Sequence, residues 1–347
     1  MRRAFLLIGV AVCVLGALAG RAGPVSAGDP VLVAAGDIAD CDSPDDEATA
    51  NLLDTIDGTV VTLGDNTYPN GTTAEFANCY GPSWGRHKAR TMPSPGNHDY
   101  NTANATAYYG YFGAAAGDPT KGYYSYDLGA WHIVVINSNS KCAAIPCGAG
   151  SAQEQWLRDD LAANPRACTL AYWHHPRFSS GAIHGSNVSL QPIWQALYDY
   201  GADVVLSGHV HNYERFALQD PTGVADPAHG IREFVVGTGG KSHYGFVSTP
   251  IANSEVQDGV TYGVLKLTLH PTSYDWQFIP IAGSTFTDTG TGACVSAASV
   301  GGVTKLSSVA AGRSELGALW GLVAAVGVAL ALGVAALLVR RRLRPNA

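Results

Sequence analysis

Short apolar runs rich in β-branched residues alternate with amphipathic segments through most of the chain, and this alternation constrains the fold more than any other feature. Helical spacing of apolar residues predicts helices over 46–56, 151–164 and 189–201, with Ser151 as a helix start and Gly201 as a stop. Strands that alternate with helices form βαβ units, so we expect an α/β domain with mostly parallel strands. The runs predicted to be buried strands are 31–37, 59–65, 131–138, 168–175, 202–209 and 232–240.

A hairpin is predicted further along the chain. Apolar and polar residues alternate with period two over 260–270 and again over 272–281, on either side of the turn sequence HPTS. Two strands joined by so short a turn pair antiparallel.

Side chains that can bind metal ions follow several of the predicted strands directly. The carboxyl ends of parallel strands meet at one edge of a sheet, where ligands bind, so we expect these side chains to gather there. Glycines precede four of them and permit tight turns. The sequences concerned are GD at 36–37, GDNTY at 64–68, PSPGNHDY at 93–100, WHH at 173–175 and GHVH at 208–211.

The mixed chemistry of this set favours a pair of transition metals. About seven or eight oxygen and nitrogen ligands exceed the four of a tetrahedral zinc site. The imidazoles distinguish the set from the all-oxygen sites of calcium and magnesium. Two first-row transition metals that share a carboxylate and a water match it. Each motif alone is more often only a turn, and the prediction rests on all five together.

The series GD…GDxxY…GNHD…H…GHxH resembles that of the calcineurin-like metallophosphoesterases, and the tyrosine in GDNTY resembles their purple acid phosphatase branch. The resemblance extends from about Val31 to Ile281. It implies an α/β fold with a two-sheet β-sandwich flanked by helices, in the αββα arrangement, and a dinuclear metal site at its edge. Ala39 stands where the branch usually has glycine, so a slightly different loop is expected near the metals.

The same resemblance assigns a role to each site residue. Asp65 would bridge the two metals, of which the first is Fe(III) in the family and the second is divalent Fe, Zn or Mn. His98 and His184 match the positions that contact the phosphate and protonate the leaving group. The first metal would be held by Asp37, Asp65, Tyr68 and His211, and the second by Asp65, Asn97, His174 and His209.

Strand geometry gives expectations for the neighbours of these residues. Alternate residues of a strand face opposite ways, so His175 should point away from His174 and either support a metal ligand indirectly or be structural. His209 and His211 should point the same way for the same reason. Arg215 could clamp a phosphate, but pairing with a neighbouring carboxylate is the favoured interpretation.

The resemblance implies an enzyme of acid-phosphatase type that hydrolyses small-molecule phosphate monoesters, and the ligands suit attack by a metal-bound hydroxide. A phosphodiesterase on the same site is the nearest alternative, and a non-catalytic surface protein that retains a structural metal centre is another. Loops 101–121, 139–150 and 216–230 would decide the substrate. Residues 28–315 carry 14 basic and 28 acidic residues, so we expect no nucleic-acid binding by bulk electrostatics. The oligomeric state is left open.

Both ends of the chain differ from its middle. Residues 1–27 have the layout of a cleaved secretory signal. Residues 284–315 are rich in small and polar residues and predict a stalk, and the uncharged 316–339 segment predicts a transmembrane helix. The basic 340–347 tail is expected in the cytoplasm. A single catalytic domain over 28–283 should therefore lie outside the cell, anchored in the membrane, as in an exported bacterial protein.

Six cysteines remain after the expected signal is removed. An even number in an exported domain predicts disulfides. None of the six forms a C-x-x-C pair, which disfavours a thiolate zinc site. The spacing alone leaves many pairings open, and Cys142–Cys147 is the one pair that we predict.

Overall fold

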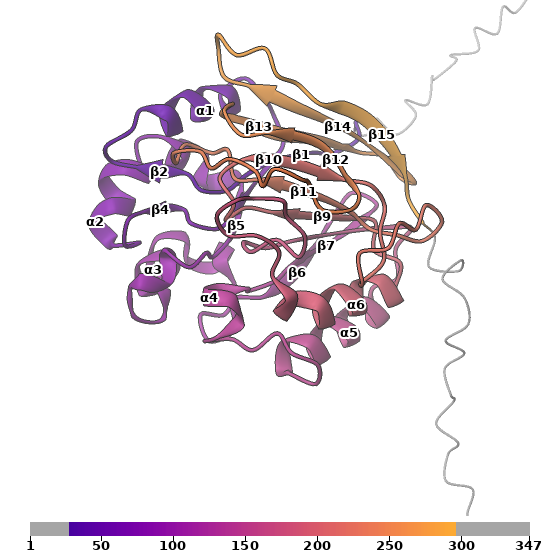
Figure 1. Cartoon of the computed structure of the whole chain (residues 1–347). Coiled ribbons are helices and arrows are strands. Elements are labelled where there is room, and N and C mark those ends of the chain that lie inside the picture. The colour runs from indigo at the N-terminus through magenta and orange to yellow at the C-terminus, as the bar shows by residue number, and fades with distance from the viewer. Residues whose placement is uncertain (1–27, 296–347) are drawn as a thin grey trace, which may run out of the picture. The chain divides into compact units, whose positions relative to one another are not determined.

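The structure, a computed structural model, describes residues 28–295, which form two large β-sheets, a two-stranded ribbon and short helices (Figure 1). The α-helices are α1 (Asp45–Leu53), α2 (Thr73–Glu75), α3 (Thr106–Phe112), α4 (Asn139–Cys142), α5 (Ala152–Ala163) and α6 (Gln191–Asp199). The strands are β1 (Val31–Ala35), β2 (Ala39–Asp40), β3 (Thr59–Leu63), β4 (Thr67–Tyr68), β5 (Thr91–Ser94), β6 (Tyr124–Leu128), β7 (Trp131–Val135), β8 (Cys168–Tyr172), β9 (Val204–Ser207), β10 (Tyr213–Phe216), β11 (Arg232–Val236), β12 (Ser254–Asp258), β13 (Gly263–Leu269), β14 (Ser273–Pro280) and β15 (Thr289–Ala293).

Parallel strands form the centre of each large sheet. The six-stranded sheet has the order β15-β14-β13-β1-β3-β5, and the seven-stranded sheet has the order β12-β10-β11-β9-β8-β7-β6. Pairing is parallel along β1-β3-β5 and along β7-β8-β9-β11, and antiparallel in the flanking strands. The expectation of mostly parallel pairing therefore holds for the centres only. Hairpins add β6 and β14, and such connections force antiparallel neighbours, whereas β13 pairs antiparallel with β1 from far along the chain.

Each of the six predicted runs contains a strand, namely β1, β3, β7, β8, β9 or β11. The predicted hairpin is also confirmed, because β13 and β14 pair antiparallel across residues 270–272. The three predicted helices correspond to α1, α5 and α6. Ser151 caps α5 by accepting a hydrogen bond from the backbone N–H of Glu154, and Gly201 follows α6 with a φ of 70°.

The central strands of the seven-stranded sheet are buried on both faces. Along β7, for example, Ile133 and Val135 join the core that also contains β1, β3 and β13, whereas Val134 belongs to a second core with α5 and α6. The same alternation continues in β8, β9 and β11, which explains why these runs are almost wholly apolar. Figure 1 shows α5 and α6 together on the side of this sheet away from β13 and β14. The described part thus has the mixed α/β, two-sheet architecture that was expected.

The folded region extends past the expected end of the domain at residue 283. Strand β15 pairs with β14 at the edge of the six-stranded sheet, within the segment expected to be a stalk. The alternating sequence TGTGA suits this place because its glycines lie beneath aromatic rings. A Cβ on Gly290 would meet the ring of Trp276 at 2.2 Å, and one on Gly292 would meet Tyr274 at 2.4 Å. Small-residue composition therefore reflects close ring packing here, and the expected boundary at 283 is wrong.

Three disulfides join the six cysteines: Cys41–Cys79, Cys142–Cys147 and Cys168–Cys294. The predicted Cys142–Cys147 pair is confirmed. The longest link attaches the end of β15 to the start of β8. Within residues 28–295 no helix is long and apolar enough to cross a bilayer. The expected signal (1–27), the rest of the stalk (296–315), the transmembrane segment (316–339) and the tail (340–347) lie outside the described residues.

Candidate metal centre

The side chains predicted as metal ligands meet where the parallel strands of both sheets end. Asp37 follows β1, Asp65 follows β3 and Asn97 follows β5, and these strands are neighbours in the six-stranded sheet. His174 follows β8 and His209 follows β9, which are neighbours in the seven-stranded sheet. Both sheets thus contribute residues to one site at the carboxyl ends of their parallel strands, as parallel α/β architecture predicts.

The backbone around the site is unusual. Asp37, Asp65 and His209 have φ values of 60°, 48° and 67°, a left-handed region that side chains other than glycine rarely adopt and that is frequent at functional sites. The neighbouring glycines permit close approach. A Cβ on Gly64 would lie 2.6 Å from the ring of His174, and one on Gly96 would lie 2.2 Å from Oδ1 of Asp65. Larger residues at these two positions would displace the site.

Four side chains form the first group of donor atoms. The Tyr68 hydroxyl lies 2.8 Å from Oδ1 of Asp37, 3.1 Å from Oδ2 of Asp65 and 3.2 Å from Nε2 of His211. Nε2 of His211 is also 3.4 Å from Oδ1 of Asp37. All four residues are buried. They are the residues that the sequence assigns to the first metal.

A second group shares Asp65 with the first. Nε2 of His174 lies 3.1 Å from Oδ2 of Asp65, 3.1 Å from Oδ1 of Asn97 and 3.2 Å from Nδ1 of His209. These are the residues that the sequence assigns to the second metal. The Oδ2 atom of Asp65 therefore lies between the two groups, within 3.1 Å of both Tyr68 and His174.

Backbone carbonyls orient two of the imidazoles. Nδ1–H of His174 donates to the carbonyl of Leu63 at 2.8 Å, and Nδ1–H of His211 donates to the carbonyl of Ser242 at 2.7 Å. Because a carbonyl only accepts hydrogen bonds, each Nδ1 carries the proton. Each Nε2 lone pair is then directed into the site, as in histidines that bind metals.

The loop that carries Asn97 is fixed by the buried carboxylate of Asp99. That carboxylate accepts hydrogen bonds from the N–H of Gly96 at 2.8 Å and from the side-chain amide of Asn66 at 3.0 Å. The N–H of His98 in turn donates to Oδ1 of Asp65 at 2.7 Å. The GNHD turn is therefore attached directly to the shared carboxylate.

The pKa shifts in the site indicate that its buried carboxylates lack a compensating positive charge. Burial lowers the pKa of His174, but the carboxylates of Asp65 and Asp37 raise it by more, to about 9. Burial and the neighbouring His174 lower the pKa of His209 to about 3, so its ring is neutral. Burial, together with Asp37 and Asp65, raises the pKa of the Tyr68 phenol well above its usual value. Only a strong cation nearby would ionise Tyr68.

The residues present fit a dinuclear metal centre. Each group combines carboxylate oxygen with imidazole nitrogen, and further oxygens come from a phenol and an amide, a mixture that suits first-row transition metals. Nε2 of His209 is buried with no hydrogen-bond partner among the described residues. Of the His, Asp, Glu and Cys side chains in the described part, Asp37, Asp65 and His174 form one compact group that could hold an ion, and His174, His175 and His209 form another.

The two histidines expected to act on the substrate lie beside this centre. Nε2 of His98 is 3.9 Å from Oδ2 of Asp65, and its Nδ1–H donates to the carbonyl of Pro69 at 2.6 Å. His184 lies on an exposed loop, and its ring centroid is 4.5 Å from that of His209. One histidine thus borders the shared carboxylate, and the other borders the second donor group.

The expectation that His175 points away from His174 is wrong, because their ring centroids are 4.9 Å apart. The ring of His175 lies 4.2 Å from that of His209, and Nδ1 of His175 lies 3.1 Å from the Ser138 hydroxyl. The reason is that β8 ends at Tyr172 and β9 ends at Ser207, so the histidines occupy turns and not strands. His209 and His211 accordingly face different donor groups.

Ser242 and Tyr244 also belong to the site, although the sequence did not predict them. The Ser242 carbonyl holds His211, and the ring of Tyr244 stacks on His211 with centroids 4.1 Å apart. The available signal was the GTGG sequence directly after strand β11. Arg215, in contrast, forms ion pairs with Asp288 and Glu255, in agreement with its favoured structural interpretation.

Comparisons with known proteins agree with this geometry. The family model described as calcineurin-like phosphoesterase matches residues 20–213. Purple acid phosphatase 15 of Arabidopsis thaliana is 29% identical over 205 residues, which cover 49% of this chain and 38% of the relative. Purple acid phosphatase 23 of the same plant is 29% identical over 184 residues, or 48% of this chain and 39% of the relative. The chain thus spans well under half the length of these curated relatives.

Solved structures show a similar fold. Purple acid phosphatase PPD1 from yellow lupin (Lupinus luteus) seeds aligns with a TM-score of 0.61 at 18% identity, over 76% of this chain and 53% of that one. GAP50, described as the anchor in the inner membrane complex of Plasmodium, aligns with a TM-score of 0.58 at 14% identity, over 76% and 88% of the two chains. The chain belongs to the calcineurin-like phosphoesterase family, and within that family it is similar to the purple acid phosphatases.

Proposed function

We propose that this protein is a two-metal phosphoesterase that hydrolyses phosphate monoesters of small molecules. The observation that carries the proposal is the position of Asp65, whose Oδ2 atom is shared by two groups of buried oxygen and nitrogen donors. When bound there, two metal ions would acidify a water nucleophile and spread the charge that develops on the phosphoryl oxygens.

The two donor groups support one set of ligands for each metal, with Asp65 common to both sets. Asp37, Tyr68 and His211 would hold the first ion together with Asp65. Because burial and two carboxylates raise the pKa of the Tyr68 phenol, its ionisation requires a highly charged cation, which supports Fe(III) at this position. Asn97, His174 and His209 would complete the second site, for divalent Fe, Zn or Mn.

His98 and His184 would handle the substrate. The Pro69 carbonyl fixes Nδ1 of His98, so its Nε2 faces the shared carboxylate and a phosphate placed there. His184 borders the second donor group from an exposed loop. An imidazole beside the ester oxygen can donate the proton that the departing alcohol requires.

Three variants of the metal-loaded full chain test this function. The substrates are 4-nitrophenyl phosphate, a monoester, and bis(4-nitrophenyl) phosphate, a diester. We expect a higher kcat/KM for the monoester, and a loss of roughly 10²–10⁴ in kcat for His98→Ala or His184→Ala. His270→Ala, at the turn between β13 and β14, serves as the matched control and should retain wild-type activity, because its ring pairs with Asp29 near the start of β1 whereas Asp37 follows the end of that strand. A diester preference would make the protein a phosphodiesterase, and no hydrolysis at any pH would leave a binding protein with a structural metal centre.

We also propose that the domain is exported and anchored at the cell surface, with 1–27 as signal, 316–339 as membrane anchor and 340–347 in the cytoplasm. All six cysteines of residues 28–295 are disulfide-bonded, which supports an oxidising compartment. Protease treatment of intact cells that express the full chain tests this. Digestion of the domain supports the proposal, and protection until the cells are lysed would contradict it.

A further inference from the structure

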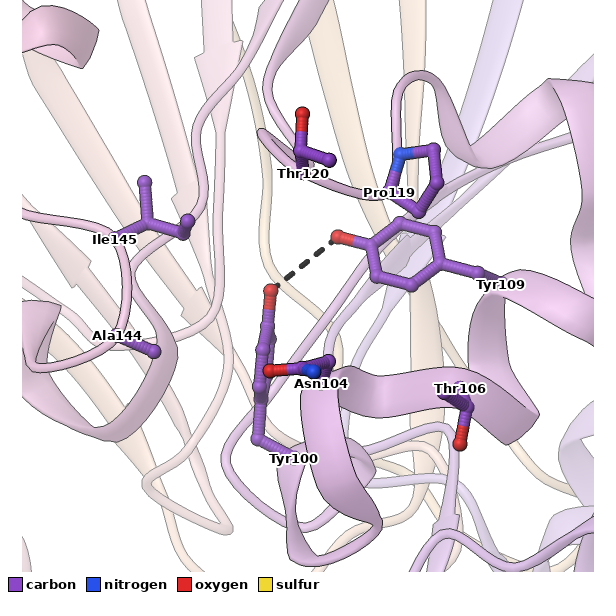
Figure 2. A pocket seen from close by; sticks show the side chains of 8 residues that line it. All are labelled: Tyr100, Asn104, Thr106, Tyr109, Pro119, Thr120, Ala144 and Ile145. Atoms are coloured by element: carbon purple, nitrogen blue, oxygen red, sulfur yellow. Dashed lines mark hydrogen bonds between the residues drawn. The ribbon is translucent and has the colours of Figure 1, made fainter.

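A pocket of about 460 Å³ lies between the loops that follow β5 and β7. Figure 2 shows Ala144 and Ile145 on one side and Tyr109 and Pro119 on the other, with Tyr100 between them. The hydroxyls of Tyr100 and Tyr109 meet at 3.3 Å (Figure 2). This size is ordinary for a small-molecule site.

One buried amide holds two walls of this pocket. Nδ2 of Asn137, just after β7, donates to the hydroxyl of Tyr100 at 2.7 Å and to the carbonyl of Lys121 at 2.9 Å. Asn137 is fully buried, and Lys121 closes the segment that carries Pro119 and Thr120. Ring and loop are therefore fixed before any ligand arrives, which lowers the entropic cost of binding.

The third wall belongs to the same network. Oδ1 of Asn137 accepts a hydrogen bond from Nδ2 of Asn139 at 2.9 Å, and Oδ1 of Asn139 accepts one from the N–H of Ala144 at 2.9 Å. The Cys142–Cys147 disulfide closes the loop that carries Ala144 and Ile145. All three walls are thus connected through two asparagine side chains.

The backbone at the rim is also unusual. Asn104 and Ala105 have φ values of 54° and 51°, so two consecutive residues other than glycine adopt the left-handed region. Such conformations are strained for residues other than glycine and persist where the surrounding structure imposes them. Here they place Asn104 at the pocket, directly before helix α3.

Short chain segments join the walls of the pocket to the metal centre. Tyr100 follows His98 by two residues, so their Cα atoms are at most about 7 Å apart. Asn101 and His98 both donate to the carbonyl of Pro69. On the other side, Ser138 stands between Asn137 and Asn139, and its hydroxyl contacts His175 beside the second donor group.

The chemistry of the walls favours an uncharged ligand group. None of the lining residues that the structure describes carries a charge. Two phenol rings, a proline and an isoleucine offer apolar faces, whereas the amide of Asn104 and the hydroxyls of Thr106 and Thr120 offer hydrogen bonds at the rim. An uncharged ring with polar edges matches this combination.

We propose that this pocket binds the alcohol portion of the phosphoester, and that this portion is an uncharged, ring-containing group such as a nucleoside. The proposal rests on the phosphoesterase function, because it places the phosphate at the metal centre and the ring between Tyr100, Tyr109 and Ile145. The substrate class is therefore a monoester of a ring-containing alcohol, and small aliphatic phosphates are poor substrates.

The test compares two monoesters of equal phosphate charge, adenosine 5′-monophosphate and glycerol 2-phosphate. Ala144→Trp and Thr120→Trp fill the pocket from opposite sides, and Ala143→Trp adds the same ring at an exposed neighbour outside the lining. We expect wild type and Ala143→Trp to favour the nucleotide in kcat/KM by about tenfold or more. Both filling variants should lose this preference through a lower kcat/KM for the nucleotide.

The proposal would be overturned if the kcat/KM for the nucleotide divided by that for glycerol 2-phosphate were near one in wild type, or if this ratio were unchanged in both filling variants. Calorimetric titration of the full chain with adenosine separates it from the phosphoesterase function. If wild type hydrolyses neither ester, adenosine binding that is lost in Ala144→Trp and kept in Ala143→Trp still supports the pocket. Failure of wild type to bind adenosine overturns it whatever the hydrolysis result.

Discussion

Replacement of Gly96 by alanine should inactivate the site without changing any of its donor atoms. A Cβ at this position would lie 2.2 Å from both the backbone N and Oδ1 of Asp65, and 2.8 Å from its Cγ. Carbon atoms make favourable contacts only near 3.5–4.0 Å, so the shared carboxylate must move by roughly 1 Å. The change therefore tests whether the position of Asp65 matters.

The size of the effect follows from the contacts of Asp65. The N–H of His98 donates to Oδ1 at 2.7 Å, and a displacement of about 1 Å takes this contact beyond hydrogen-bonding distance. A misplacement of that size at a reacting centre costs about 10²-fold in rate. We also expect a lower free energy of unfolding, by about 1–3 kcal/mol, because of overpacking.

The assay is kcat/KM for 4-nitrophenyl phosphate, accompanied by metal content and thermal unfolding. Gly110→Ala is the matched control, because a Cβ there meets nothing within 4 Å and the residue lies inside α3. This control should keep full activity and gain about 0.5–1 kcal/mol in stability. Gly96→Ala with activity within about threefold of wild type would refute the reasoning.

Two further predictions concern stability. Burial lowers the pKa of His132, but Asp160, at 2.8 Å, and a second aspartate raise it above its usual value. The stabilisation is therefore complete below the unfolded pKa and is lost as pH rises through the folded one, so His132→Gln should cost about 1–3 kcal/mol at pH 5 and less at pH 9 in urea unfolding. A pH-independent cost would contradict the charged pair. Because Cys168–Cys294 spans 126 residues and Cys142–Cys147 spans 5, serine replacement should cost about 5 kcal/mol for the first pair and about 2 kcal/mol for the second. A larger shift of the urea midpoint for loss of Cys142–Cys147 than for loss of Cys168–Cys294 would show that loop entropy does not decide the stability loss.

Three donors of the metal centre, Asp37, Asp65 and His174, could be predicted because each follows a recognisable strand. The runs before Asp37, Asp65 and His174 are short, apolar and buried on both faces. A polar residue directly after such a run must therefore lie at the edge of the sheet. The antiparallel strands at the sides of the sheets have weaker sequence patterns. The composition of β15 is typical of a stalk, because its packing depends on aromatic rings that β14 supplies.

The residues that the sequence misplaced or did not predict all depend on tertiary structure that local patterns do not show. The orientation of His175 follows from where β8 ends, and sequence patterns place strand ends only within a few residues. Ser242 and Tyr244 reach His211 from a loop whose path depends on the entire seven-stranded sheet. The pocket beside Tyr100 likewise depends on Asn137, a residue that no local pattern distinguishes.

Metal content of the purified full chain, measured by mass spectrometry after loading with iron and zinc, tests the shared carboxylate most directly. Wild type should contain close to two ions per chain. Asn97→Ala and His211→Ala should each keep about one, because each removes a ligand of a single site, whereas Asp65→Ala should lose both. A wild-type protein with one ion, or an Asp65→Ala protein that keeps two, would contradict the dinuclear centre.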